Sequence, residues 1–312
     1  MTRDDHVLVL GGTGVDTIVH VPELPLPFAD SYPVPAIQAR AGQTGDGVAI
    51  GLRALGFRVS LIDTIGDDPE GTLVRSLHAR YGVALTGIHT TAGTKRAVNL
   101  VDPGGRRLSL YDVSRRHESD RLPIDLVTEV AQQAGHVHVS ITHPCQHALP
   151  ALRGAGLSIS TDLHNWDGVN PWHEPFAYQC DIVFVSTTAL TDVEETMRKI
   201  ITNGRAHSVI ATAGADGAYL LERNSHGVRH FPAAQPPAPA VDSNGAGDAF
   251  AAAFLSGHLH GEPVETCMRY GAIAGAHACT VPSAETNPID TEGLQRAAEH
   301  RGRPRGVPAT AV

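Results

Sequence analysis

A glycine-rich loop that ends in a carboxylate lies between Asp242 and Asp248, with the sequence Asp-Ser-Asn-Gly-Ala-Gly-Asp. The apolar spacing of Phe250 and Phe254 indicates that a helix begins at this loop. Unpaired N–H groups and the helix dipole would make the loop a cradle for phosphate. A carboxylate repels phosphate, so Asp248 is interpreted as a base that takes a proton from an attacking hydroxyl.

This string resembles the carboxy-proximal signature of the ribokinase-like (PfkB) carbohydrate kinases, usually Asp-Thr-x-Gly-Ala-Gly-Asp. The resemblance implies that Asp248 is the catalytic base and that the amides of Gly245, Ala246 and Gly247 form the anion hole. It also implies that Asn244 contacts the nucleotide. Taken alone, the string also fits a glycine-rich turn that merely starts a packed helix.

Asp16 and the turn from Gly42 to Asp46 are the candidate acceptor ligands. Asp16 follows the first predicted strand, where open α/β sheets place ligands, and a carboxylate can accept two hydrogen bonds from neighbouring hydroxyls. The turn resembles the family's Gly-Gly-x-x-x-Asn motif, but Gln43 replaces the second glycine and Asp46 replaces Asn. If Asp46 faces the acceptor, the site is strongly negative and favours a neutral sugar or nucleoside. Alternatively, Asp46 caps the helix that begins near Gly47.

Thr212, Gly214 and Gly217 are the candidate nucleotide ligands, because the resemblance places ATP phosphates and ribose at this loop. Thr212 offers a hydroxyl group, and Gly214 allows close backbone approach. Since Tyr219 resumes a strand pattern, the segment also fits an ordinary hairpin turn.

The cofactors that the resemblance implies are ATP and Mg²⁺, and a K⁺ requirement is common in the family near the glycine-rich loop. The family's Asn-x-x-Glu pair, which helps to order Mg²⁺, is absent, since Ser186 and Ala189 stand at those positions. The sequence therefore leaves the metal ligands unknown.

Alternating strand and helix patterns supply the elements that must position these residues. Strand patterns occur at 136–141, 157–161, 181–185 and 207–212, with helical patterns between them. This alternation implies an α/β fold, a doubly wound and mostly parallel sheet flanked by helices. The proline-rich segment 17–41 and the hairpin segment 95–113 are expected to form a small β-sheet lid. We expect one ribokinase-like domain over residues 1–300 and a flexible tail over 301–312.

Composition and net charge argue against some classes of binding partner. The formal net charge of −9 over 312 residues argues against nucleic acid as a partner. No apolar run reaches the roughly 18 residues that a membrane span needs. A signal-peptide core is not recognised and the four cysteines are scattered, so a cytoplasmic location is expected. In the family, lid edges often pair between chains, so a homodimer through the lid is expected.

Two charged clusters have alternative interpretations. Four neighbouring histidines invite a metal site, but no nearby cysteine or carboxylate completes a ligand set, so packing or surface roles are favoured. They are His136, His138, His143 and His147. Arg115 and Arg116 could neutralise an anionic acceptor but are interpreted as solvated lid surface.

The sequence therefore predicts an ATP-dependent kinase that transfers the γ-phosphoryl group to a hydroxyl of a small neutral sugar. One alternative is a nucleoside kinase with an adenosine- or pseudouridine-like acceptor. An alternative of another class is a nucleotide- or sugar-binding protein without turnover, which the missing Asn-x-x-Glu pair would allow.

Overall fold

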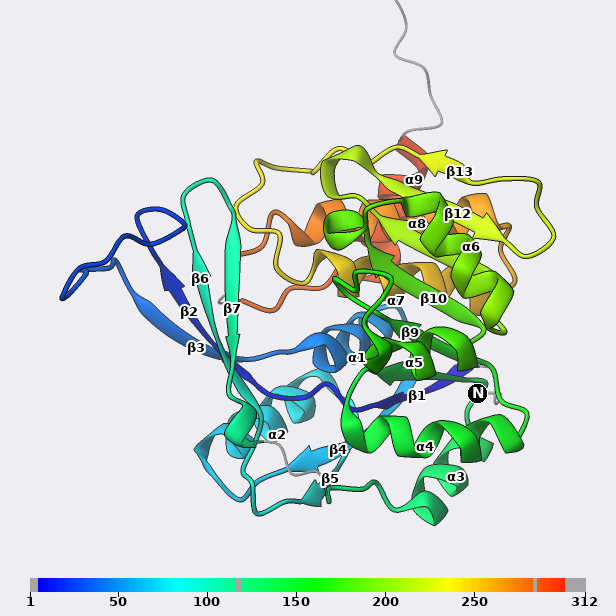
Figure 1. Ribbon diagram of the computed structural model, residues 1–312, viewed down its shortest axis with the longest axis horizontal. Coiled ribbons are helices and arrows are strands. Elements are labelled where there is room, and N and C mark those ends of the chain that lie inside the picture. The colour runs from blue at the N-terminus through cyan, green and yellow to red at the C-terminus, as the bar shows by residue number, and fades with distance from the viewer. Residues whose placement is uncertain (1–4, 116–118, 283–284, 301–312) are drawn as a thin grey trace, which may run out of the picture.

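Nine strands within residues 5–115, 119–282 and 285–300, the part of the chain that the computed structural model describes, form a central sheet (Figure 1). They are β1 His6–Leu10, β4 Arg58–Ile65, β5 Ala84–His89, β8 His136–Ser140, β9 Ile159–Asp162, β10 Ile182–Ser186, β11 Ser208–Thr212, β12 Ala218–Glu222 and β13 Arg229–Phe231. Their order is β13-β12-β11-β10-β9-β8-β1-β4-β5. Neighbours from β11 to β5 are parallel, whereas β12 and β13 are antiparallel.

The direction in which the chain adds strands reverses next to β1. Its sequence His-Val-Leu-Val-Leu is buried throughout, as suits a parallel strand that helices cover on both faces. β4 and β5 follow on one side of β1, and β8 to β11 follow on the other. Open α/β sheets bind ligands beyond the carboxyl ends of the strands at such a reversal. The ends of β1, β8 and β9 are therefore where a ligand site is expected.

Helices cover both faces of the sheet and enclose two apolar cores. The helices are α1 Thr44–Ala54, α2 Pro69–Tyr81, α3 Ile124–Gln132, α4 His143–Gly154, α5 Glu174–Gln179, α6 Val193–Asn203, α7 Ala246–Leu259, α8 Val264–Ala278 and α9 Thr291–His300. One core lies against α3 to α6, and the other lies against α1, α2 and α7 to α9. Short 3-10 turns join several elements, namely η2 Val113–Arg115, η3 Pro171–His173, η4 Thr187–Ala189 and η5 Gly214–Asp216.

A separate four-stranded sheet projects from this body as a lid (Figure 1). It contains β2 Val15–His20, β3 Ile37–Ala41, β6 Arg96–Val101 and β7 Arg107–Tyr111, in the order β3-β2-β6-β7. Because side chains alternate along a strand, the pairing divides the lid into two faces. The inner face carries Asp16, Arg40, Asn99, Ser109 and Arg107. The outer face carries Val19, Ile37, Leu100, Leu108 and Leu110.

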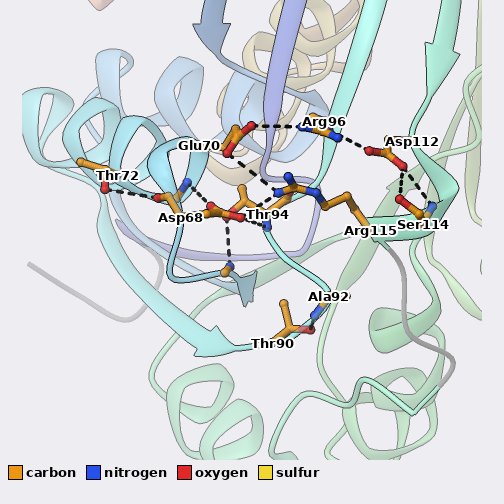
Figure 2. A network of polar contacts seen from close by, with 12 residues as sticks. Asp68, Glu70, Thr72, Thr90, Ala92, Thr94, Arg96, Asp112, Ser114 and Arg115 are labelled. Carbon is orange, nitrogen blue, oxygen red and sulfur yellow. Dashed lines mark hydrogen bonds and ion pairs between the residues drawn. The ribbon is translucent and has the colours of Figure 1, made fainter.

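A polar network ties the base of the lid to the start of α2 (Figure 2). Asp68 caps α2, and its carboxylate accepts hydrogen bonds from the Thr94 N–H at 2.8 Å and the Thr94 hydroxyl at 2.6 Å. The Arg115 guanidinium donates to the same carboxylate at 2.7 Å. The interpretation of Arg115 as solvated surface is therefore wrong, because this side chain anchors the lid. Arg116 lies outside the described residues.

The predicted fold class is confirmed, with one correction at Asp16. Asp16 does not end the first strand. The chain turns at Gly11–Gly14, and Asp16 is the second residue of the lid strand β2. The predicted tail, 301–312, lies outside the described residues.

Of the four histidines, His136 and His138 pack inside the sheet on β8, whereas His143 and His147 lie on α4. His136 and His138 are buried on β8 and share the Ser160 hydroxyl, at 2.7 and 2.9 Å. Among the described residues, no group of three or more potential metal-ligating side chains occurs. The four cysteines are free, and no helix in the described part of the chain could cross a membrane.

Candidate active site

The glycine-rich loop leads into α7 as a backbone cradle. Gly245 is the N-cap residue and has φ 78°, a left-handed conformation that glycine adopts without steric cost. The first N–H groups of a helix have no partner within the helix, so those in the first turn point toward the space before α7. The Ala246 N–H already donates to the Ser243 carbonyl at 3.2 Å. Gly245 and Gly247 therefore offer the clearer amide contacts to an anion.

Close packing of α1 against α7 fixes the position of Asp248. A Cβ atom on Gly47 would lie 2.8 Å from the Asp248 Cβ, and one on Gly51 would lie 2.8 Å from the Ala252 Cβ. Glycine at both positions lets the two helices approach. The Gly-x-x-x-Gly spacing in the sequence was the available signal for this packing.

Asp248 is surrounded by other acids. Burial raises the pKa of Asp248 to about 8, and the negative charges of Asp162 and Asp16 act in the same direction. The positive charges of Arg107 and Arg40 oppose this rise. A carboxyl with a raised pKa binds a proton more readily than an ordinary aspartate, as a general base requires.

Asp16 lies on the inner face of the lid, directly opposite Arg40 in the pairing of β2 with β3. Its side chain is buried, and the Gln43 amide donates to Oδ1 at 3.5 Å. Burial raises the pKa of Asp16 to about 6, whereas Arg40 and Gln43 lower it. The structure therefore brings Asp16 and Asp248 into one electrostatic environment.

Gly42 and Asp46 shape the turn between the lid and α1. Gly42 has φ 150°, and its N–H donates to the Gly14 carbonyl at 3.1 Å. Asp46 is fully buried, and its carboxylate accepts the N–H groups of Gln43 at 2.8 Å and Gly14 at 3.2 Å. The His78 Nε2 atom lies 2.6 Å from the other oxygen of Asp46. The surroundings of Asp46 are thus those of a capping residue that holds the Gly14 turn.

The predicted nucleotide loop follows β11. Thr212 ends that strand, and Gly214 and Gly217 have φ values of 57° and 97° in the turn to β12. The turn is therefore also a hairpin, as the alternative interpretation stated. A pocket of about 560 Å³ lies between the segment after β13 and the helices α8 and α9. Its walls include Ala234, Ile273, His277, Ile289 and Arg296, and they do not include Asp248.

Two arginines on the inner face of the lid reach across to the C-terminal half of the chain. Arg107 on β7 donates a hydrogen bond to the Asn244 Oδ1 atom, in the glycine-rich loop. Arg40 on β3 donates to the Glu285 carbonyl at 3.0 Å. Asn244 itself is held by an N–H bond to Asp242 at 2.7 Å.

Sequence reasoning missed Arg40, Arg107 and Gly47. Asp162 also belongs to the group of acids around Asp248, because its charge raises the pKa of that residue. The pairing of the lid strands decides which face each arginine occupies, and alternation of side chains within the lid segments 17–41 and 95–113 was the available signal.

Comparison with known proteins gives matches to carbohydrate kinases. A profile of the pfkB family carbohydrate kinases matches residues 179–292. Acarbose 7(IV)-phosphotransferase of an Actinoplanes species is 57% identical over 298 residues, which are 96% of this chain and 100% of that protein.

Solved structures match over nearly the whole chain. The structure of Mak1, a microbiome-derived acarbose kinase, matches with a TM-score of 0.87 and 43% identity, covering 94% of this chain and 98% of that one. Arabidopsis thaliana ribokinase, complexed with ribose and ATP, matches with a TM-score of 0.79 over 93% of this chain and 97% of that one. Its identity is 21%, so it supports the fold alone.

Proposed function

The chain belongs to the pfkB family of carbohydrate kinases, and we propose that it transfers the γ-phosphoryl group of ATP to a hydroxyl of acarbose or a closely similar pseudo-oligosaccharide. One observation carries the choice of acceptor. The 57% identity with the Actinoplanes phosphotransferase spans 96% of this chain, so it includes lid and body together. This favours a sugar over the nucleoside acceptor and over a binding protein without turnover.

Asp248 acts as the general base in this proposal. It takes the proton of the acceptor hydroxyl while the oxygen forms a bond to the γ-phosphorus atom. The bond between that phosphorus and the β,γ-bridging oxygen breaks, and ADP leaves. The amides at Gly245 and Gly247, with the positive end of the α7 dipole, stabilise the negative charge on the transferring group.

The acceptor binds beneath the inner face of the lid, against Asp16 and the Gly42 turn. The buried carboxylate of Asp16 can accept hydrogen bonds from two neighbouring hydroxyls. Asp46 does not need to touch the acceptor, because its carboxylate is occupied by Gln43, Gly14 and His78. We assign it to positioning the turn.

The nucleotide occupies the other end of the site. Thr212, Gly214 and Gly217 contact its phosphates and ribose, and Asn244 contacts the phosphates. The pocket beside α8 and α9 has enough volume, about 560 Å³, to hold a nucleotide base.

Magnesium would enter with the phosphates of ATP and neutralise part of their charge. In such sites it usually keeps several waters and contacts one or two carboxylates. Asp162 fits this role, because its carboxylate lies close enough to Asp248 to raise the pKa of that residue. Asp242 supports a separate K⁺ site, since its Oδ2 atom is buried without a hydrogen-bond partner among the described residues.

The molecule is proposed to act as a dimer in the cytoplasm. ATP is available there, and the free thiols of the chain suit a reducing compartment. The apolar outer face of the lid supports pairing with a second copy, because Ile37, Leu108 and Leu110 are 67%, 44% and 53% exposed.

The assignment is tested with Asp248→Asn and an acceptor panel. The panel contains acarbose, neutral monosaccharides, a sugar phosphate and adenosine, and each acceptor is assayed with and without potassium. Asp248→Asn should lower kcat with acarbose at least about a hundredfold while ATP still binds, because only the base is lost. Asp125→Asn, an exposed aspartate in the first turn of α3, is the matched control and should leave turnover unchanged. Unchanged turnover in Asp248→Asn would refute the mechanism, and preference for another acceptor would refute the substrate.

A further inference from the structure

The proposed site gathers negative charge from several carboxylates. Asp16, Asp162 and Asp248 share one electrostatic environment, and ATP brings further negative charge to the same place. The family's Asn-x-x-Glu pair, which helps to order Mg²⁺, is absent, since Ser186 and Ala189 stand at those positions. Negative charges held in one place repel one another, so the carboxylates oppose the binding of ATP. Cations are therefore needed where the phosphoryl group is transferred.

Arg107 lies where it can supply one of these positive charges. It pairs with Val101 on the inner face of the lid, the same face as Asp16 and Arg40. From there its guanidinium reaches Asn244, four residues before Asp248 in the anion-hole loop. Its positive charge acts on both Asp248 and Asp16. Arg107 therefore lies near the acceptor end and the phosphate end at once.

On this basis, and resting on the kinase function proposed above, we propose that Arg107 is a catalytic residue carried by the lid. When ATP and the acceptor are bound, it contacts an oxygen of the transferring phosphoryl group in place of the Asn244 amide oxygen.

The present partner of Arg107 suits this exchange. The Asn244 oxygen is neutral, whereas an oxygen of the transferring phosphoryl group is negatively charged, so exchange of partners adds charge attraction and allows bidentate contact with the guanidinium. Among the described residues Arg107 forms no ion pair with a carboxylate, unlike Arg96, Arg106 and Arg115 on the same lid. Its side chain is exposed, so a ligand can reach it. Asn244 thus orients a cation that no carboxylate has already neutralised.

The contact would act mainly in the transition state. As the acceptor oxygen attacks and the bond to ADP breaks, negative charge is spread over the oxygens of the transferring group. Preorganised cations near these oxygens lower the barrier more than they strengthen binding of the ground state. Arg107 neither takes nor gives a proton in this step, because Asp248 receives the proton of the acceptor.

Substitution of Arg107 separates this role from acceptor binding. Arg107→Met should lower kcat about a hundredfold or more and change the KM for the acceptor by less than about threefold. Arg107→Lys should recover part of the loss, because it restores the charge without the forked geometry. Arg106→Met is the control, since Arg106 is the neighbouring lid residue and pairs with Asp102 of its own hairpin. It should retain wild-type kcat.

A binding measurement gives a readout that does not depend on turnover. In calorimetry with Mg²⁺, aluminium fluoride should tighten ADP binding to the wild-type chain, because it imitates the transferring phosphoryl group. Arg107→Met should lose most of this tightening, whereas ADP alone should bind as before. All variants are also compared by thermal melting, and equal midpoints show that the fold is retained.

The outcomes distinguish this inference from the proposed function. A wild-type chain that ignores acarbose refutes the acceptor, while the fluoride experiment still reports on Arg107. A loss confined to acceptor KM, or fluoride tightening that persists in Arg107→Met, would overturn the catalytic role. Equal behaviour of Arg107→Met and Arg106→Met would overturn it as well.

Discussion

Ionised Asp248 destabilises the folded chain, because its surroundings favour the protonated carboxyl group. Burial raises its pKa in the fold to about 8, from an ordinary value of 3.8. Stability from this group is thus fully present below about pH 4 and is lost as pH rises toward 8. The raised pKa that supports the proposed role of Asp248 as proton acceptor therefore lowers the free energy of unfolding near neutral pH.

Asp248→Asn should accordingly raise the melting temperature while it abolishes transfer. We expect a gain on the order of 1–3 kcal/mol at pH 8, below the full value of the pKa shift because the half-buried carboxyl still meets solvent. The gain should decline as pH falls and vanish below about pH 4. Differential scanning calorimetry at both pH values measures this, with Asp125→Asn as the control. A variant that melts below wild type at pH 8 would contradict the expectation.

Single residues were predictable where their role depends on neighbours in sequence. The glycine-rich loop and Asp248 share one turn, so their proximity in the structure follows from the string itself. Asp46 is different, because its partner His78 lies 32 residues further along the chain. The choice between an acceptor ligand and a cap therefore could not be made before the structure placed α2 beside α1.

At the scale of elements, β8 contains two buried histidines that make the sheet sensitive to acid. Burial lowers the pKa of His138 to about 4, and burial also lowers that of His136 well below its ordinary value. A histidine whose pKa is depressed contributes stability that is present above about pH 6.5 and is lost as pH falls.

His138→Gln should make the chain less sensitive to acid. Between pH 7 and pH 4 the wild-type chain should lose about 3 kcal/mol more stability than the variant, because glutamine does not titrate. Urea unfolding at a series of pH values measures the difference. His147→Gln, on the exposed surface of α4, should follow the wild-type curve. Equal pH dependence in His138→Gln and wild type would show that His138 does not titrate as stated.

The lid illustrates what local patterns can and cannot predict. The hairpin from β6 to β7 was expected from two strand patterns around a Pro-Gly-Gly turn, and it is present. The reach of Arg107 to Asn244, across 137 residues, depends on how the whole lid folds over α7. Such a contact is decided by tertiary packing, which strand periodicity does not contain.

At the scale of the whole molecule, the lid leaves apolar surface and two strand edges uncovered. β3 and β7 are the edges of its sheet, and Leu108 and Leu110 are exposed on its outer face. Natural proteins usually cover such edges, and a second copy of the chain would do so here.

Leu110→Glu should therefore convert the proposed dimer into a monomer, since it places a charge in the apolar contact. Sedimentation equilibrium measures the mass directly. Ile124→Glu, an exposed apolar residue at the start of α3, is the control and should leave the mass unchanged. A wild-type chain that sediments as a monomer, or a Leu110→Glu chain that stays dimeric, would refute this interface.

The alternating strand and helix patterns were sufficient to predict a parallel sheet covered on both faces. They could not give the strand order, because parallel neighbours are far apart in sequence. β1 pairs with both β4 and β8, and this arrangement places the end of β9, with Asp162, and the Gly11–Gly14 turn on the same edge of the sheet near the reversal point.

The division of the lid into two faces also limits which mutations its strands can tolerate. Neighbouring residues such as Arg107 and Leu108 serve different surfaces, one toward the chemistry and the other toward the outside. Loss or gain of a single codon within β7 would move each following side chain to the opposite face. Substitutions can adjust either surface alone, whereas small insertions and deletions should be confined to the loops between the lid strands.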